Sequence, residues 1–295
     1  MNLRLINILV PLMFFGCSQS NNNNLVTYES EDNGNYVTKH FTTSDGIKLR
    51  YLTSGNGPVL VLQPGWMMPA ELFTPQLEKL SNSFRVIALD PRGQGLSEDA
   101  PNDNYVDRRA KDIYELIEHE NIDTLVLGGW SLGVLEVLRY VEMYGANNLK
   151  GLVLIDGPIT TDDEEFVQPG WKNLVNGLQT NRDEFEKGFM AALFNKQQDS
   201  VFYSLIENRL SNTPTNSSFV AIATHIAEPR DYSSVLDNIS VPTLVTLAIW
   251  DFQLENYKKI KSNVSIEMFD SGHALFVDES ERFNELVIEL HERSR

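Results

Sequence analysis

The residues best suited to chemistry form the pentapeptide GWSLG, in which Ser131 lies between Gly129 and Gly133. An apolar run that begins at Leu125 precedes it, and an amphipathic helical pattern over 132–144 follows it. This order predicts a tight turn between a buried strand and a helix, a setting that exposes a serine hydroxyl. Glycines fit such a turn because larger side chains would collide with the strand and the helix. The sequence therefore predicts Ser131 as a catalytic nucleophile.

A serine hydroxyl is a poor nucleophile at neutral pH until a base takes its proton, and five histidines could be that base. His273, in the segment FDSGHALF, is the one that follows a late apolar run, in a loop that contains Gly272. We therefore predict His273 as the base. The other histidines lie in a predicted hairpin, near charged helix ends or in a helical region: His40, His119, His291 and His225.

The base in turn needs a carboxylate that fixes its tautomer and stabilises the imidazolium. Asp251 ends the apolar run PTLVTLAIWD and precedes His273 by enough chain for one helix and one strand. Asp156, in LIDGP at the end of an earlier run, is the competing candidate. We prefer Asp251, which gives a triad in the chain order Ser131, Asp251 and His273.

The elements around these residues must position them. Along the chain, short apolar runs alternate with helical patterns. The apolar runs cover 58–65, 84–90, 124–130, 149–157, 242–250 and 264–270. Such runs are typical of strands that are covered on both faces, as in a parallel sheet. Two further runs near the start of the globular part, joined by the turn residues SDG, predict a hairpin. The expected fold class is a doubly wound α/β architecture with a mostly parallel sheet.

One region breaks this alternation. Between Gly157 and Val241 the sequence has several amphipathic helical stretches and no convincing strand, and it is too long for a plain crossover loop. We interpret it as a helical cap over 159–236, inserted into a core made of 36–158 and 237–295. The alternative is an ordinary set of crossover helices.

Composition limits the classes of partner. The chain has 295 residues, 42% of them hydrophobic, so it can bury a full core without disulfides or a metal. Its 24 basic and 41 acidic residues give a net charge of −17, which repels nucleic acid and anionic lipid headgroups. We therefore expect no nucleic-acid partner.

The N-terminal segment MNLRLINILVPLMFFGC has one basic residue followed by an apolar stretch that is too short to span a bilayer. It predicts a signal peptide over 1–16. Gly16 before Cys17, the only cysteine, resembles the lipobox of bacterial lipoprotein signals, which implies that Cys17 is acylated. The polar residues 17–35 then predict a flexible tether. We expect a protein of the bacterial cell envelope, anchored to a membrane through lipid; an ordinary signal peptide is the alternative.

From residue 36 onward, the sequence resembles the α/β-hydrolase superfamily, especially its capped esterase and haloperoxidase-like branch. The segment DPRGQGLS over 90–97 is similar to the family's D-x-R-G-x-G-x-S loop. The segment VPTLVTLAIWD resembles the one that carries the acid, with Ala248 in place of the usual glycine. GWSLG is similar to the corresponding motif of pimeloyl methyl ester esterases. Dehalogenases and epoxide hydrolases of this superfamily carry aspartate at the position of Ser131, so the resemblance argues against both.

A serine hydrolase also needs two backbone N–H groups that stabilise the developing oxyanion. Leu132 is expected to supply one, at the start of a helix where the helix dipole assists. The family places the other after a His-Gly pair. Gln63 and, beyond Pro64, Gly65 match that pair in this chain, which implies Trp66 as the second donor.

An apolar, aromatic substrate pocket is expected around Trp130 and Met67, together with Trp66 and Met68; core packing is the alternative for each methionine. The expected function is hydrolysis of a small carboxylic ester or lactone through an acyl-enzyme intermediate, without cofactor or metal. Two alternatives stay open at this point. One is a carbon–carbon bond hydrolase or lyase that uses the same triad, and the other is a non-catalytic ligand-binding homologue.

Overall fold

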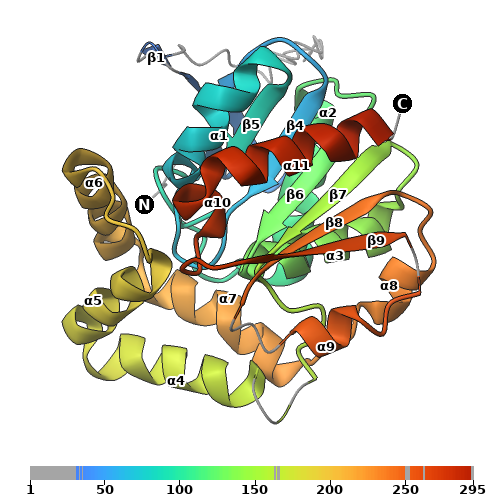
Figure 1. Ribbon diagram of the computed structural model, residues 1–295. Helices are drawn as coiled ribbons and strands as arrows, with labels where there is room; N and C mark the ends of the chain where they lie inside the picture. Colours follow the sequence, from blue (N-terminus) through green and yellow to red (C-terminus); the bar gives the residue numbers. More distant parts are fainter. Residues whose placement is uncertain are drawn as a thin grey trace, which may run out of the picture.

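A mixed β-sheet forms the centre of the molecule. The computed structural model describes residues 31–32, 34, 36–162, 164, 167–249, 253–261 and 263–293. In this part of the chain the strand order is β1-β2-β3-β5-β4-β6-β7-β8-β9 (Figure 1). The strands are β1 (Glu31–Asp32), β2 (Val37–Thr42), β3 (Lys48–Ser54), β4 (Val59–Gln63), β5 (Arg85–Leu89), β6 (Leu125–Trp130), β7 (Leu149–Ile155), β8 (Thr243–Ala248) and β9 (Val264–Phe269).

The sheet is antiparallel at one side and parallel over the rest. β1, β2, β3 and β5 pair antiparallel in that order, whereas β5, β4, β6, β7, β8 and β9 pair parallel. All residues of β6 and β8 are buried, as their continuous apolar runs predicted. The carboxyl ends of the parallel strands lie at one edge of the sheet, which is where ligand sites form in such folds.

Helices cover both faces of the sheet, so the expected fold class is confirmed. Figure 1 shows α11 crossing one face of the central strands, with α3 behind them. On the first face, α11 contacts α1, β7 and β8, and on the second, α3 contacts α2, α8, β4 and β6. The helices of the core are α1 (Thr74–Lys79), α2 (Val106–His119), α3 (Leu132–Tyr144), α8 (Ser233–Asp237), α9 (Leu254–Tyr257), α10 (Leu275–Asp278) and α11 (Ser280–Arg293), with short 3-10 turns η1 (Ala70–Phe73) and η2 (Leu80–Asn82).

Four consecutive helices lie between β7 and β8: α4 (Val167–Thr180), α5 (Arg182–Leu193), α6 (Ser200–Asn212) and α7 (Thr215–Ala227). We call them the cap; they lie beside the sheet at the lower left of Figure 1. Two of them begin at a capping side chain, since Asn181 accepts a hydrogen bond from an N–H of α5 and Asp199 accepts two from α6. An ion pair of 3.1 Å between Arg209 of α6 and buried Glu71 ties the cap to the core.

The start of the globular part differs in one detail from the expectation. The predicted hairpin is present as β2 and β3. Glu31 and Asp32, within the segment expected to be a flexible tether, pair with Val37 and Thr38 of β2 as strand β1. The edge of β2 offers unpaired backbone groups, so even a polar segment can extend the sheet by a short strand.

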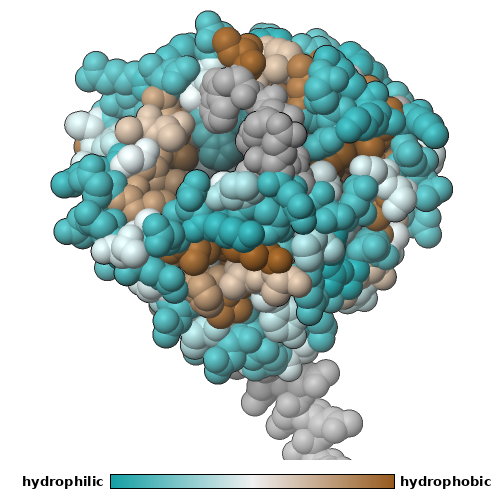
Figure 2. Space-filling view, turned by 90° about the horizontal axis from the view of Figure 1, so that it is seen from below, coloured by the Kyte–Doolittle hydropathy of each residue, from teal (hydrophilic) through white to brown (hydrophobic). Residues whose placement is uncertain are grey.

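The surface agrees with the strongly acidic composition. Figure 2, which views the molecule from below, shows mostly hydrophilic residues with separate hydrophobic patches between them. Within the described residues, no helix has the length and apolar character that crossing a bilayer requires.

Candidate active site

Ser131 lies at the sharp turn between β6 and α3, with φ 55° and ψ −120°. Non-glycine residues rarely adopt a positive φ, so the surrounding packing must hold this conformation. A Cβ on Gly129 would lie 2.3 Å from the Gly133 carbonyl oxygen, and one on Gly133 would lie 2.5 Å from that of Gln63. Both positions therefore require glycine, for the steric reason that the sequence indicated.

His273 contacts a carboxylate, and that carboxylate belongs to Asp156. His273 Nδ1 lies 2.6 Å from Asp156 Oδ2, and Asp156 Oδ1 accepts a hydrogen bond of 2.8 Å from the Ala248 N–H at the end of β8. The Asp156 side chain is almost fully buried, so its two oxygens are fixed by these contacts. The arrangement favours Asp156, the competing candidate, over the preferred Asp251, which lies outside the described residues.

The cap and the core together hold the His273 loop in place. The backbone N–H groups of His273 and Ala274 donate to the carbonyls of Ala192 and Leu193 at the end of α5, at 3.1 and 2.8 Å. Trp130 Nε1 donates to the His273 carbonyl at 2.9 Å, and the two rings are in contact. The position of the imidazole therefore depends on α5 as well as on the core.

A cavity of about 370 Å³ brings the chemical groups together. Ser131, His273 and Asp156 line it, and so do Trp66 and Leu132. Its other lining residues come mainly from the cap and are largely apolar: Gly157, Pro158, Val167, Gly170, Trp171, Leu174, Phe189, Ala192, Ile222 and Gln253. Neither lysine nor arginine is among these described lining residues, so the cavity suits an uncharged, apolar molecule.

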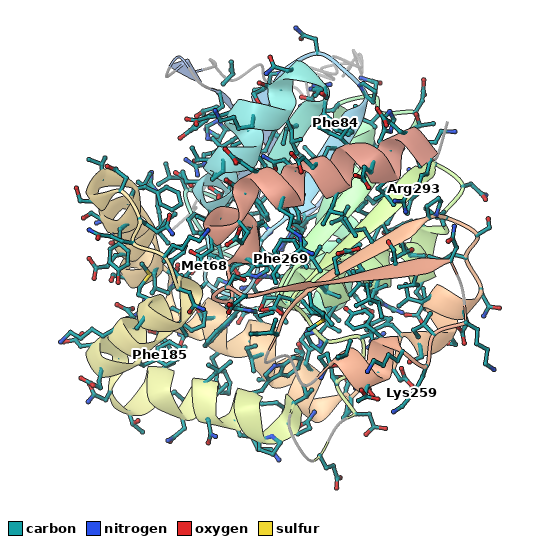
Figure 3. The ribbon with its side chains drawn as sticks, viewed as in Figure 1. Met68, Phe84, Phe185, Lys259, Phe269 and Arg293 are labelled. Carbon is teal, nitrogen blue, oxygen red and sulfur yellow. The ribbon has the colours of Figure 1, made fainter. Side chains whose placement is uncertain are left out.

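Three residues expected in the pocket wall, Trp130, Met67 and Met68, do not line this cavity. Trp130 is fully buried beneath the His273 loop, and Met67 is fully buried with φ 61°. Figure 3 shows the neighbouring Met68 where the core meets the cap. The sequence pattern failed here because an apolar side chain beside a catalytic residue can pack inward as readily as toward the cavity. The cap residues that line the cavity instead include Trp171 and Phe189. Nothing in the sequence beyond the amphipathic pattern of their helices indicated this position.

The two residues expected to donate to the oxyanion, Leu132 and Trp66, line the same cavity as the serine. Leu132 is the first residue of α3, so its N–H is one of the free donors at a helix start. A Cβ on Gly65 would lie 2.8 Å from Ser131 Cβ, so the loop that carries Trp66 is packed against the serine. In the described structure, neither N–H takes part in the backbone hydrogen bonds of turns and helix ends. Both are available to a bound oxyanion.

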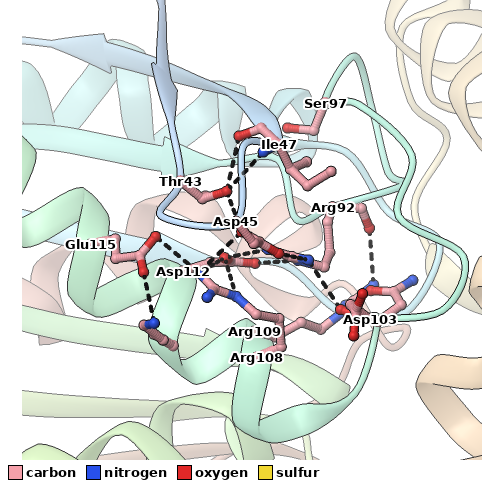
Figure 4. Close-up of polar contacts among 12 residues, drawn as sticks. Thr43, Asp45, Ile47, Arg92, Ser97, Asp103, Arg108, Arg109, Asp112 and Glu115 are labelled. Atoms are coloured by element: carbon pink, nitrogen blue, oxygen red, sulfur yellow. Dashed lines mark hydrogen bonds and ion pairs between the residues drawn. The ribbon is translucent and has the colours of Figure 1, made fainter. Parts of the chain in front are cut away.

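A separate group of carboxylates, Asp45, Asp112 and Glu115, has the spacing of metal ligands. Figure 4 shows that arginines already contact these oxygens. Arg92 binds Asp112 at 2.6 Å and Asp45 at 2.9 Å, and Arg108 binds both Asp112 and Glu115. The group is an ion-pair network of the core, because its negative charge is balanced by guanidinium groups.

Comparison with known proteins agrees with this geometry. The sequence profile of the alpha/beta hydrolase fold matches residues 58–280, and the chain belongs to this family. It is 24% identical to the AB hydrolase superfamily protein YisY of Bacillus subtilis, over 87% of this chain and 98% of that protein. It is 27% identical to a putative non-heme chloroperoxidase of Synechocystis, over 86% of this chain and 98% of that protein.

A solved structure gives the same picture of the fold. The esterase EaEST from Exiguobacterium antarcticum superposes with a TM-score of 0.77 at 24% identity, covering 86% of this chain and 98% of the esterase. The esterase structure shows the shared fold, the relatives include a putative non-heme chloroperoxidase, and the chain is a hydrolase of the α/β-hydrolase family.

Proposed function

We propose that this hydrolase cleaves a small, uncharged carboxylic ester or lactone through an acyl-enzyme intermediate, without a cofactor. The observation that carries the proposal is a single cavity that contains Ser131 on its strained turn and His273 in contact with Asp156. A nucleophile, a base and an acid that orients the base are the components that acyl transfer needs.

In the proposed reaction, Ser131 Oγ attacks the substrate carbonyl carbon while His273 Nε2 takes the hydroxyl proton. His273 Nδ1–H donates to Asp156 Oδ2, which stabilises the imidazolium. The backbone N–H groups of Trp66 and Leu132 donate to the oxyanion of the tetrahedral intermediate. The imidazolium then protonates the leaving alkoxide, and a water molecule activated by His273 releases the acid and restores the serine.

The lining of the cavity supports the substrate class. Trp66, Trp171 and Phe189 offer aromatic surface, and burial of apolar area contributes roughly 25 cal/mol per Å² to binding. A carboxylate or phosphate on the substrate would find no cationic side chain among the described lining residues, apart from the imidazole of His273. We therefore expect neutral acyl and alcohol groups, and a volume of about 370 Å³ limits them to small molecules.

The proposal is tested by the variant Ser131→Ala and by p-nitrophenyl esters of increasing acyl length, with lactones in parallel. Loss of the nucleophile should lower turnover by about 10⁴-fold to 10⁶-fold while the melting temperature stays near that of the wild type. Ser234→Ala, an exposed serine on α8, is the matched control and should keep full activity. Activity of Ser131→Ala within tenfold of the wild type would rule out the assignment of the nucleophile.

We also propose that the mature protein is held at a membrane of the bacterial cell envelope by acyl chains on Cys17. Cys17 and the preceding segment lie outside the described residues, so the support comes from the sequence: a basic residue, a short apolar stretch and Gly16 before the cysteine. Each buried methylene contributes about 0.8 kcal/mol, so several chains would anchor the protein stably.

A further inference from the structure

Five polar side chains are buried beneath the loop that carries Trp66. Each is at most 2% exposed, and none of them lines the cavity. They come from β4, the loop after β5, the start of α2 and the middle of α3: Gln63, Gln94, Asn104, Arg109 and Glu136. Buried polar groups cost stability unless they are hydrogen-bonded, so their partners indicate what they hold in place.

Gln94 contacts the backbone of the loop directly. Its Nε2 donates to the carbonyl oxygens of Gly65 and Met68, both at 2.8 Å. The Met68 N–H also donates to the Gly65 carbonyl, at 3.2 Å, which closes a tight turn over 65–68. The Gln94 side chain therefore fixes both ends of this turn.

The Gly65 carbonyl and the Trp66 N–H belong to the same peptide group. No cis peptide bond occurs in the described chain, and in a planar trans peptide the C=O and N–H point in opposite directions. A carbonyl that is held toward Gln94 on one side therefore directs the Trp66 N–H toward the opposite side. Donation to the carbonyl also polarises the peptide group, which strengthens its N–H as a donor.

We infer that Gln94 is a positioning residue for the oxyanion hole, which aims the Trp66 N–H at the developing negative charge. The inference rests on the proposed function, because it assigns a role within that reaction. Gln94 lies at the x of the G-x-G in DPRGQGLS, a place where the resembled motif specifies no residue type. The motif alone therefore gives no reason to single it out.

The orientation of the Gln94 amide is itself fixed. Arg109 Nη2 donates to Gln94 Oε1 at 2.7 Å, which leaves Nε2 to face the loop carbonyls. Arg109 in turn donates to Glu136 at 2.8 Å and to Asn104 at 2.7 Å. Glu136 also accepts a hydrogen bond from Gln63, so the same carboxylate holds the end of the strand that leads into the loop.

Replacement of Gln94 by methionine, which has nearly the same length and no donor, is the first test. Loss of one oxyanion-hole donor costs about 10²-fold to 10³-fold in kcat, so a misdirected donor should cost about 10-fold to 10²-fold. KM should change less than threefold, because the ground-state ester carbonyl gains little from the oxyanion donors. Binding of a phenylboronic acid, which forms a tetrahedral adduct with serine, should weaken by the same factor as kcat.

Gln94→Glu separates the two roles of the amide. A carboxylate still accepts from Arg109 but cannot donate to the Gly65 and Met68 carbonyls, so this variant should lose as much kcat as Gln94→Met. If Gln94→Met does not fold, the kcat and boronate affinity of Gln94→Glu test the inference in its place. Gln76→Met is the matched control, since Gln76 is fully buried and donates to the Phe276 carbonyl at 2.7 Å and to Asn284 at 3.1 Å rather than to a carbonyl of the loop. Its kcat and boronate affinity should stay within twofold of the wild type.

The outcomes are distinguishable from those of the proposed function. If the wild type cleaves esters and both Gln94 variants keep kcat and boronate affinity within twofold of Gln76→Met, the inference is wrong and the proposed function stands. A parallel loss of kcat and boronate affinity in the Gln94 variants alone supports it. A wild type without esterase or lactonase activity would overturn both.

Discussion

Asp156 and His273 meet because they follow β7 and β9, parallel strands on either side of β8 whose carboxyl ends lie at the same edge of the sheet. Asp156 directly follows β7, has φ 41° and is fixed by two contacts with β8: the Thr246 carbonyl accepts its N–H, and the Ala248 N–H donates to its side chain. A strained aspartate held in this way is characteristic of a residue whose orientation matters for chemistry. We therefore assign Asp156 as the acid of the proposed triad.

The variant Asp156→Asn tests this assignment, because it replaces one carboxylate oxygen by an amide nitrogen. An amide in place of the carboxylate favours the wrong imidazole tautomer, and the loss of a triad carboxylate lowers turnover by roughly 10⁴-fold. We expect that decrease in kcat at pH 7, measured with the best p-nitrophenyl ester. Asp251→Asn is the comparison and should keep most of the activity. An active Asp156→Asn beside a folded but inactive Asp251→Asn would return the role to Asp251.

Among the elements, the cap contains a histidine that is buried behind the cavity wall. His225 of α7 is 2% exposed and packs edge-on against Trp171 of α4, with ring centroids 5.0 Å apart. Burial, assisted by the charges of Arg109 and Arg230, lowers the pKa of His225 to about 3. The imidazole is therefore neutral in the folded protein at the pH of any ordinary assay.

Stability in acid should depend on this residue. The ordinary pKa of 6.5 applies in the unfolded chain, so between pH 6.5 and 3 the unfolded state binds a proton at His225 that the folded state does not. The free energy of unfolding should fall as pH falls through this window, by up to about 1.4 kcal/mol per pH unit. His225→Phe should reduce the slope of unfolding free energy against pH between 4.5 and 6.5, measured by urea denaturation.

The comparison in that experiment is His119→Phe, which replaces an exposed ring on α2. Its slope should match the wild type, because the substitution removes no buried imidazole. If the slope of His225→Phe also matches the wild type, the acid sensitivity does not come from the α4–α7 contact and the assignment fails. A reduced slope would identify this contact as the acid-sensitive part of the cavity wall.

At the scale of the whole molecule, the folded hydrolase and its proposed anchor are separate parts of the chain. The face of the molecule that Figure 2 shows is mostly hydrophilic, and the net charge of −17 does not favour contact with anionic lipids. The proposed attachment is therefore assigned to the N-terminal segment.

Labelling with palmitate tests the anchor. The full-length protein expressed in a bacterial host should incorporate labelled palmitate and fractionate with membranes, whereas Cys17→Ser should do neither. Esterase activity of Cys17→Ser in the soluble fraction is the control that the domain still folds. Equal labelling of both proteins would remove the proposal of a lipid anchor.

Much of the fold follows from local patterns in the sequence. The runs that became β4 to β9 are mostly apolar, and the helices between them show one apolar face, because each residue's burial depends on the period of its own element. The turn at Ser131 could be predicted from the two glycines beside it and from the apolar and helical patterns that flank it, although the atoms closest to Gly133 belong to Gln63 of β4. The hairpin of β2 and β3 likewise needs only its own turn residues.

Only the tertiary structure decided which distant groups meet. Asp156 lies 117 residues before His273, and the sequence alone offered it only as the competing candidate for the acid. Gln94 contacts the loop carbonyls directly, and its amide is held by Arg109 of α2, which pairs with Glu136 of α3. The cavity wall comes largely from cap helices. Such contacts depend on how strands are ordered and how helices pack across the sheet. Those are properties of long-range packing, which residue spacing alone does not determine.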